Sequence, residues 1–274
     1  MSIKLGVLMD PIQNISYKKD STLAMLWAAQ DRGWDIIYLE QQDLYLLNGQ
    51  ARAQVKPLTV FRSDQRWYEF GIQTDSALED LDVILMRKDP PFNREFIYTT
   101  YLLENAEKHG VLVVNRCQSL RDCNEKVFAT EFSDCCPATL VSKSYDHLLF
   151  FLETHRDIIV KPLDGMGGAS VFRVAYDDPN VQVILEMMTN HGEETIMAQR
   201  FLPEISAGDK RIIMICGKPA PYCLARVPLP GETRANLAAG GKGLAQKLSD
   251  RDHWIAQQIG DTLIEKGLMF VGLD

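Results

Sequence analysis

The sequence predicts two domains, an α/β domain with a parallel sheet followed by an α+β domain with antiparallel sheets. A strand, helix, strand succession occurs twice within residues 3–114, and such a succession implies parallel pairing through a right-handed crossover. After residue 115 the apolar runs are separated mostly by short turns, which is typical of antiparallel pairing. At 274 residues the chain is long enough for two domains of ordinary size.

The first strand, helix, strand unit begins with an apolar run at residues 3–9, which predicts a strand. Asp20 is the expected N-cap of a helix whose apolar residues recur at helical spacing until Gly33. The run at 35–40 predicts the second strand of this unit.

The second unit follows the same order, with a strand at 83–86, a helix over 92–108 and a strand at 111–114. Between the two units, residues 44–70 mix short strand-like runs with turn residues. We expect the first domain to cover residues 1–121.

The second domain is expected to cover residues 122–274, with the boundary region near 116–124. A turn is expected at Gly217-Lys218-Pro219. The segment 228–243 is rich in Gly and Pro and has no strand or helix periodicity, and a loop of that length is usually functional or disordered. The predicted strands are 157–163, 170–174, 195–202, 210–216 and 222–227.

The composition narrows the class of partner. The net charge of −8 would repel a phosphate backbone, so nucleic acid is not an expected partner. Neither a signal peptide nor an apolar run of about 20 residues is present, which predicts a cytoplasmic protein with no membrane partner. The six cysteines show no zinc-site spacing, and we expect them to be reduced structural thiols.

A glycine-rich turn follows the apolar run that ends in Lys161. Gly165, Gly167 and Gly168 lie within four positions, and glycines allow backbone N–H groups to approach a phosphate chain. The string lacks the spacing of a Walker A loop or of a dinucleotide fingerprint. A strand follows the turn, so it could fold over a nucleotide as a flap; a plain tight hairpin is the competing interpretation.

Two lysines and several further residues are candidates for a site. Lys161 lies in an apolar strand, where its ammonium is costly unless it meets an anion such as phosphate, although it could also extend to the edge of the strand. Lys126, by pattern alone, would be placed on a solvated helix face. Asp209 could accept hydrogen bonds from ribose hydroxyls, and Arg226 and Arg234 flank or lie in the long loop, where arginines suit an acidic substrate or are merely surface residues.

No GxSxG, HExxH or paired Cys and His motif is present, so the chemistry is expected to depend on positioning and charge stabilisation. Against this background, several strings together resemble the bacterial glutathione synthetases of the ATP-grasp superfamily. They are SLRDCNEK at 119–126, IIVKPLDGMGGAS at 158–170, AQRFLP at 198–203, GDKR at 208–211, PYCLARVP at 221–228, GETRANLAAGGKG at 231–243, LMRKDPPF at 85–92 and the opening MDPI.

The resemblance implies an ATP-dependent ligase that joins γ-L-glutamyl-L-cysteine to glycine through an acyl phosphate, with Mg²⁺ as metal and a homotetramer as assembly. It implies phosphate contacts for Lys126 and Lys161 and a flap formed by the three glycines. The remaining implied roles are Gln199 and Leu202 at adenine, Asp209 at ribose, Arg211 at the reacting phosphate, Arg226 and Arg234 at the γ-glutamylcysteine side, and Asp274 at the metal.

The family continues beyond the position of Asp274 into a return strand whose Glu and Asn complete the metal site, so the resemblance implies an ATP-grasp domain that is incomplete here. Two alternatives stay open. One is another ATP-grasp ligase that joins a different carboxylate to an amine, and the other is a nucleotide-binding module without turnover.

Overall fold

The computed structural model describes residues 2–165, 167–227 and 242–274, which form two compact units, Met1–Asp122 and Cys123–Asp274. The Arg234 position and most of the long loop at 228–243 lie outside the described residues, whereas Lys242 and Gly243, expected in that loop, begin a strand. In the part of the chain that is described, no helix is both long enough and apolar enough to cross a membrane.

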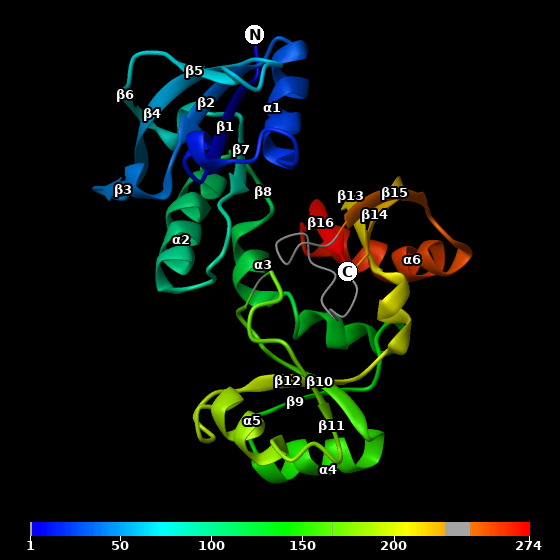
Figure 1. Ribbon diagram of the computed structural model, residues 1–274. Helices are drawn as coiled ribbons and strands as arrows, with labels where there is room; N and C mark the ends of the chain where they lie inside the picture. Colours follow the sequence, from blue (N-terminus) through cyan, green and yellow to red (C-terminus); the bar gives the residue numbers. More distant parts are fainter. Residues whose placement is uncertain (1, 166, 228–241) are drawn as a thin grey trace. The chain divides into compact units, whose positions relative to one another are not determined.

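The first unit is built on an eight-stranded sheet with a parallel centre (Figure 1). The order β3-β4-β2-β1-β7-β8 has β1 parallel to both β2 and β7, and β5 and β6 pair with β4. The elements are β1 (Lys4–Met9), α1 (Ser21–Asp31), β2 (Asp35–Leu39), β3 (Leu44–Leu47), β4 (Gln50–Val60), β5 (Tyr68–Phe70), β6 (Thr74–Ala77), β7 (Val83–Arg87), α2 (Arg94–Lys108), β8 (Leu112–Val114) and α3 (Cys117–Asp122), with short 3-10 turns η1 (Ile12–Asn14), η2 (Gln41–Asp43) and η3 (Leu78–Asp80).

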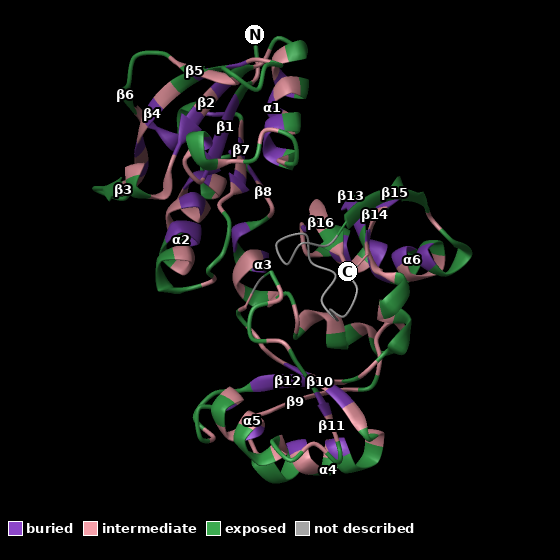
Figure 2. Ribbon diagram, in the orientation of Figure 1, coloured by how far each residue is buried: buried purple, intermediate pink, exposed green. Residues whose placement is uncertain are grey.

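Both predicted strand, helix, strand units are confirmed. Asp20 caps α1, and its carboxylate accepts a hydrogen bond from the backbone N–H of Leu23 at 2.8 Å. Helix α1 buries Leu23 and Leu26 against one face of the sheet, and α2 buries Leu103 against the other core cluster. The two core clusters therefore lie on opposite faces of the central strands. Figure 2 shows these strands largely in the colour of buried residues.

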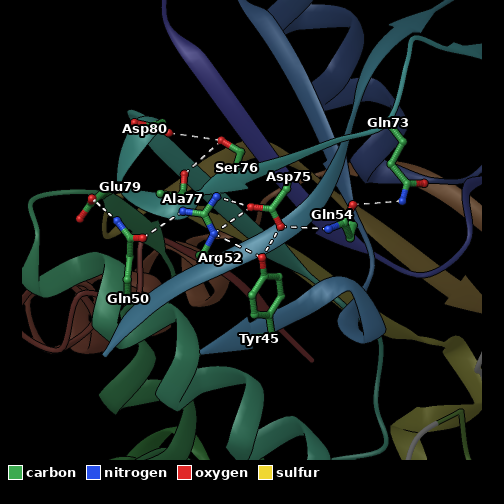
Figure 3. Close-up of polar contacts among 10 residues, drawn as sticks. All are labelled: Tyr45, Gln50, Arg52, Gln54, Gln73, Asp75, Ser76, Ala77, Glu79 and Asp80. Atoms are coloured by element: carbon green, nitrogen blue, oxygen red, sulfur yellow. Dashed lines mark hydrogen bonds and ion pairs between the residues drawn. The ribbon is translucent and has the colours of Figure 1, made fainter. Parts of the chain in front are cut away.

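The region at 44–70 contains the long strand β4 with β3 and β5 paired antiparallel to it, and β6, just beyond this region, also pairs antiparallel with β4. A polar network holds this corner of the sheet together (Figure 3). Arg52 Nε on β4 donates to Asp75 of β6 at 2.8 Å, and Tyr45 of β3 also bonds Asp75. These side chains are partly exposed, so the network fixes register more than it adds stability.

The second unit contains two four-stranded antiparallel sheets, in the orders β11-β10-β12-β9 and β15-β14-β13-β16. Its elements are η4 (Phe128–Cys135), β9 (Thr139–Ser142), α4 (Tyr145–His155), β10 (Asp157–Pro162), β11 (Phe172–Ala175), α5 (Val181–Met188), β12 (Ile196–Arg200), η5 (Pro203–Ala207), β13 (Asp209–Ile215), β14 (Lys218–Val227), β15 (Lys242–Lys247), α6 (Asp250–Glu265) and β16 (Phe270–Leu273). The antiparallel strand pairing predicted for the second domain is confirmed.

Each sheet of the second unit has its own helical cover and its own core. Leu148 and Leu152 of α4 and Leu185 of α5 pack on the apolar face of β10 and β12. Ala256, Ile259 and Leu263 of α6 pack on β13 and β14. Because one face of each sheet is covered in this way, residues that alternate with the core along these strands point to the opposite face.

The turn between β13 and β14 differs from the expected Gly217-Lys218-Pro219. Cys216 and Gly217, both at positive φ, make the turn, while Lys218 already pairs with Ile215. A Cβ at Gly217 would lie 2.7 Å from the carbonyl oxygen of Gly260, so the close approach of α6 to this hairpin also requires glycine.

The capping box of α6 gives a prediction about stability. Asp252, which is 7% exposed, accepts hydrogen bonds from the Ser249 N–H at 2.8 Å and from Lys210 Nζ at 2.6 Å. We expect Asp252→Ala to lower the free energy of unfolding by about 2–3 kcal/mol, because the capping-box hydrogen bond from the Ser249 N–H and the ion pair with Lys210 are both lost. Denaturant unfolding measures the change, and Asp250→Ala in the same helical turn is the control, expected within about 0.5 kcal/mol of the parent.

The same contact predicts a pH dependence. Burial disfavours the Asp252 carboxylate, but its hydrogen bonds with Lys210 and Ser249 outweigh burial and hold its pKa below the usual value. The stabilisation is therefore complete above the usual carboxyl pKa of about 4 and is lost as the pH falls through the lowered pKa. A difference between parent and Asp252→Ala that does not shrink in acid would contradict this account.

Candidate active site

Lys161 lies on the face of β10 that points away from the helices. Ile158 and Val160 on this strand are fully buried in the core under α4 and α5, and strand alternation places Lys161 on the other face. Strand β10 is paired on both sides, by β11 and β12, so this position is held by the centre of the sheet.

The Lys161 ammonium has no hydrogen bond or ion pair to any of the described residues. Burial lowers the pKa of Lys161, and the neighbouring charge of Lys126 lowers it further. Two cationic side chains are thus held close enough to repel each other. This arrangement favours an anion that the Lys161 ammonium can contact.

The sequence pattern placed Lys126 on a solvated helix face, and this expectation is wrong. It lies in a turn after α3, its side chain is 14% exposed, and its Nζ donates to the carbonyl oxygens of Leu163 at 3.0 Å and Gly165 at 2.8 Å. It also forms an ion pair with Glu125. Lys126 therefore joins the segment after α3 to the glycine-rich turn that follows β10.

The glycine-rich turn has the backbone conformations that its sequence requires. Gly167 and Gly168 adopt φ of 67° and 81°, a region that other residues rarely occupy. A Cβ at Gly165 would lie 2.9 Å from Pro162 Cγ, so a larger residue would displace the turn. Met166, between them, lies outside the described residues.

Gln199 shares the exposed face of the sheet with Lys161. It pairs with Ile159 of β10 on one side and Thr139 of β9 on the other, and its amide donates to Thr139 Oγ at 3.0 Å. Leu202, 40% exposed, follows β12 and precedes η5. The Gln199 amide can form hydrogen bonds with the polar edge of a planar base, and the apolar Leu202 side chain can pack against its face.

Asp209, Arg226, Asp274 and Arg211 form a chain of alternating charges. Arg226, whose side chain is 6% exposed, donates from Nε and Nη2 to the two carboxylate oxygens of Asp209, each at 2.7 Å. Its Nη2 also lies 3.2 Å from Asp274, and Arg211 binds Asp274 through two hydrogen bonds. Strands β13, β14 and the end of β16 bring these four residues together.

The arginines keep Asp274 ionised. Burial acts to raise its pKa, but hydrogen bonds and charge from Arg211, followed by those from Arg226, hold the pKa below its usual value. Hydrogen bonding to Asp274 raises the pKa of Arg211 in turn. The negative charge of Asp274 acts to raise the pKa of Lys161, so the two sheets of this unit interact electrostatically.

The donor set can be compared with what Mg²⁺ requires. No group of three or more His, Cys, Asp or Glu side chains suited to a metal occurs among the residues that the structure describes. Mg²⁺ is often held by one or two carboxylates together with substrate phosphates, and Asp274 offers one ionised carboxylate. Asp274 therefore fits as a single protein ligand.

Sequence reasoning missed the partners of these residues. Glu125 pairs with Lys126, and Asn124 extends its amide toward Leu163 and Asp164 at 3.4 Å. Both stand inside the SLRDCNEK string, so a polar cluster next to a candidate lysine was a usable signal. Thr139 was missed because only the pairing of β9 with β12 brings it to Gln199.

Comparison with known proteins assigns both units to one family. Residues 3–121 match the N-terminal domain of prokaryotic glutathione synthetase, and residues 125–274 match the ATP-grasp domain of the same family. The chain is 66% identical over 274 residues to a glutathione synthetase of Pseudomonas syringae pv. tomato, covering 100% of this chain and 86% of that protein. It is 58% identical to one of Escherichia coli, covering 99% and 86%.

Solved structures show the fold at much lower identity. The chain resembles the ATP-grasp ligase PsnB, solved with a minimal precursor, Mg and ADP, with a TM-score of 0.60 at 15% identity, covering 98% of this chain and 83% of that one. It resembles the D-cycloserine synthetase DcsG with a TM-score of 0.61 at 13% identity, covering 97% and 83%. The predicted fold class is thereby confirmed, and the chain belongs to the prokaryotic glutathione synthetase family, with an ATP-grasp domain as its second unit.

Proposed function

We propose that this protein is an ATP-dependent ligase that joins γ-L-glutamyl-L-cysteine to glycine and releases ADP and phosphate. The observation that carries the proposal is the family match of both units, with relatives named glutathione synthetase at up to 66% identity. ATP-dependent glutathione synthesis, with ATP and Mg²⁺ as requirements, is the activity of this family.

The unpartnered ammonium of Lys161 supports a nucleotide site in the second unit. In the proposal, Lys161 and Lys126 bind the phosphates, and Gly165, Gly167 and Gly168 cover them with backbone N–H groups. Gln199 and Leu202 contact adenine. Asp209 binds ribose in this scheme while its carboxylate also orients Arg226.

Two bond exchanges make up the proposed ligation. The cysteinyl carboxylate attacks the γ-phosphorus, the bond to the ADP oxygen breaks, and an acyl phosphate forms. The amine of glycine then attacks the acyl carbon, phosphate leaves, and the amine gives up a proton as the amide forms. Arg211 stabilises the charge that develops at the phosphoryl oxygens, and well-placed donors of this kind contribute about 3–4 kcal/mol each.

The other charged residues position the acceptor and the metal. Arg226 is oriented by Asp209 and Asp274, and with Arg234 it is proposed to bind the γ-glutamylcysteine side. Arg234 lies outside the described residues. Asp274 would hold Mg²⁺, which supplies charge stabilisation at the phosphates when bound.

Omission of each substrate in turn tests the proposed reaction. We expect ADP release to require γ-glutamylcysteine. We expect the amide product to form only when glycine is present as well. ADP release without γ-glutamylcysteine but with another carboxylate would indicate a ligase of different specificity. ATP binding with no ADP release under any combination would indicate a binding module and overturn the proposal.

We propose that residues 1–121 and 122–274 are the two functional domains, a division supported by the compact units that separate at Asp122. We also propose a homotetramer in the cytoplasm. Light scattering of the purified protein measures the assembly state, and a monomer at working concentration would contradict the tetramer.

A further inference from the structure

The Gln199 amide ends a short chain of hydrogen bonds on the sheet face that carries Lys161. Strand β12 runs between β9 and β10 (Figure 1). Gln199 pairs with Thr139 of β9, while Lys161 pairs with Met197, two residues before Gln199. This spacing makes Lys161 and Gln199 diagonal neighbours on one face. The amide therefore lies beside the ammonium that the proposed function assigns to phosphate.

The Thr139 hydroxyl determines which way this amide faces. Its Oγ lies 2.8 Å from the Pro137 carbonyl oxygen, which has no hydrogen to donate. The single hydroxyl hydrogen of Thr139 must therefore lie in this contact. The second contact of Oγ, at 3.0 Å to the Gln199 side chain, then requires a donor on Gln199. Only the amide NH2 group can donate, so the NH2 group points to Thr139 and Oε1 is held on the other side of the amide.

The orientation leaves Gln199 Oε1 as an acceptor that a ligand can reach. Oε1 has no hydrogen-bond partner in the described chain, and no side-chain oxygen described there is both buried and without a partner, so Oε1 is accessible. It can accept from the 6-amino group of adenine. The 6-oxo group of guanine or hypoxanthine is itself an acceptor, so the same oxygen would face it with no hydrogen between them.

We propose that Thr139 is a positioning residue that makes the enzyme select adenine over 6-oxopurine nucleotides. Its hydroxyl, committed to the Pro137 carbonyl, holds the Gln199 amide with Oε1 toward the base. The inference rests on the proposed function, because contact between Gln199 and adenine is part of that proposal. Thr139 does not touch the nucleotide and acts through Gln199. Without the hydroxyl, the amide can turn and offer its NH2 group to a 6-oxo group instead.

Steady-state kinetics with ATP and inosine triphosphate (ITP), which has a 6-oxo group in place of the 6-amino group, test the inference. In the parent we expect kcat/KM to be at least about 10-fold lower for ITP, as for one polar group left without a partner. Thr139→Val keeps the side-chain shape without the hydroxyl and should reduce this ratio to about 3-fold or less. The change should appear in KM for the nucleotide and not in kcat, because the base is remote from the bonds that react.

Thr139→Ser is the conservative variant. It keeps the hydroxyl and should keep the parent ratio of ATP to ITP, within about 2-fold. The control for the substitution itself is Thr154→Val. Thr154 is an exposed threonine of α4 whose hydroxyl donates to the Phe150 carbonyl oxygen at 2.8 Å, away from Gln199. This variant should also keep the parent ratio.

A Gln199→Glu background isolates the orientation of the amide. Both oxygens of a carboxylate accept hydrogen bonds, so no hydroxyl is needed to choose the atom that faces the base. Thr139→Val should therefore change the ratio of ATP to ITP by no more than about 2-fold in this background, although it changes the ratio in the parent. An equal change in both backgrounds would show that Thr139 does not act through the amide and would overturn the inference.

The outcomes separate the inference from the proposed function. If the parent forms no glutathione from γ-glutamylcysteine, glycine and ATP, the proposed function fails and the inference fails with it. If the parent is active but uses ATP and ITP equally, the inference fails and the ligase stands. The same holds if Thr139→Val loses activity with both nucleotides in equal proportion, which indicates a structural role only. Comparing nucleotides within one variant cancels any loss of folded enzyme.

Discussion

Lys161→Met is expected to abolish most ATP binding and to lower kcat/KM for ATP by about 10²–10³-fold. Two unit charges about 4 Å apart interact by roughly 4 kcal/mol at the effective dielectric of a protein surface, and methionine keeps the length of the side chain without the charge. A ligand that binds only the folded state raises the melting temperature, so thermal shift on addition of ATP is the direct measurement. The parent should shift and the variant should not.

The stability of the ligand-free variant makes this prediction more specific. Because burial and Lys126 disfavour the Lys161 ammonium, Lys161→Met without ATP should be at least as stable as the parent. The pKa of Lys161 is lowered in the folded state, so its charged form destabilises the fold fully below that pKa. This destabilisation disappears as the pH rises through the lowered pKa toward the usual lysine value of about 10.4. The advantage of the variant in denaturant unfolding should therefore shrink with rising pH.

Lys218→Met is the matched control, since Lys218 is an exposed lysine at the start of β14. It should leave both the ATP-induced shift and kcat/KM within about 2-fold of the parent. An ATP-induced shift of equal size in Lys161→Met and the parent would remove Lys161 from the phosphate site. A ligand-free variant that is clearly less stable than the parent would show that Lys161 stabilises the fold.

The sequence was most informative where the signals are local. The cap at Asp20 and the apolar runs of β1 and β10 depend on neighbours within a few positions, and these elements were predicted. Helices α4 and α6 were not predicted, although Ser144 and Ser249 are N-caps that accept backbone hydrogen bonds. Those two caps were readable local signals, so these omissions do not reflect a physical limit.

The partners of the candidate site residues could not be predicted in the same way. Arg226 meets Asp209 because β13 and β14 pair in one register, and it meets Asp274 only after β16 has joined the same sheet. A residue's burial is likewise set by distant segments: Lys126 looked solvated by pattern, yet the turn after β10 supplies its carbonyl partners. Long-range pairing carries this information, and no window of sequence contains it.

Asp274→Asn is expected to lower Mg²⁺-dependent turnover by at least about 10²-fold while changing the fold little. Mg²⁺ prefers charged oxygen ligands in near-octahedral geometry, and an amide oxygen is a weaker donor than the carboxylate it replaces. The side chains of Asp274 and Arg211 are 43% and 46% exposed, so loss of their ion pair should cost no more than about 1 kcal/mol. Arg226 keeps its two hydrogen bonds to Asp209 in the variant.

Two measurements together identify the cause of the loss. Turnover at increasing Mg²⁺ should require a much higher concentration in Asp274→Asn, and the affinity for ADP should depend on Mg²⁺ far less than in the parent. Asp261→Asn, an exposed substitution on α6, is the control and should match the parent in both. Turnover within about 3-fold of the parent at every Mg²⁺ concentration would show that Asp274 does not hold the metal, and its contacts with Arg211 and Arg226 would then have a structural role only, because an amide can still accept a hydrogen bond from a guanidinium group.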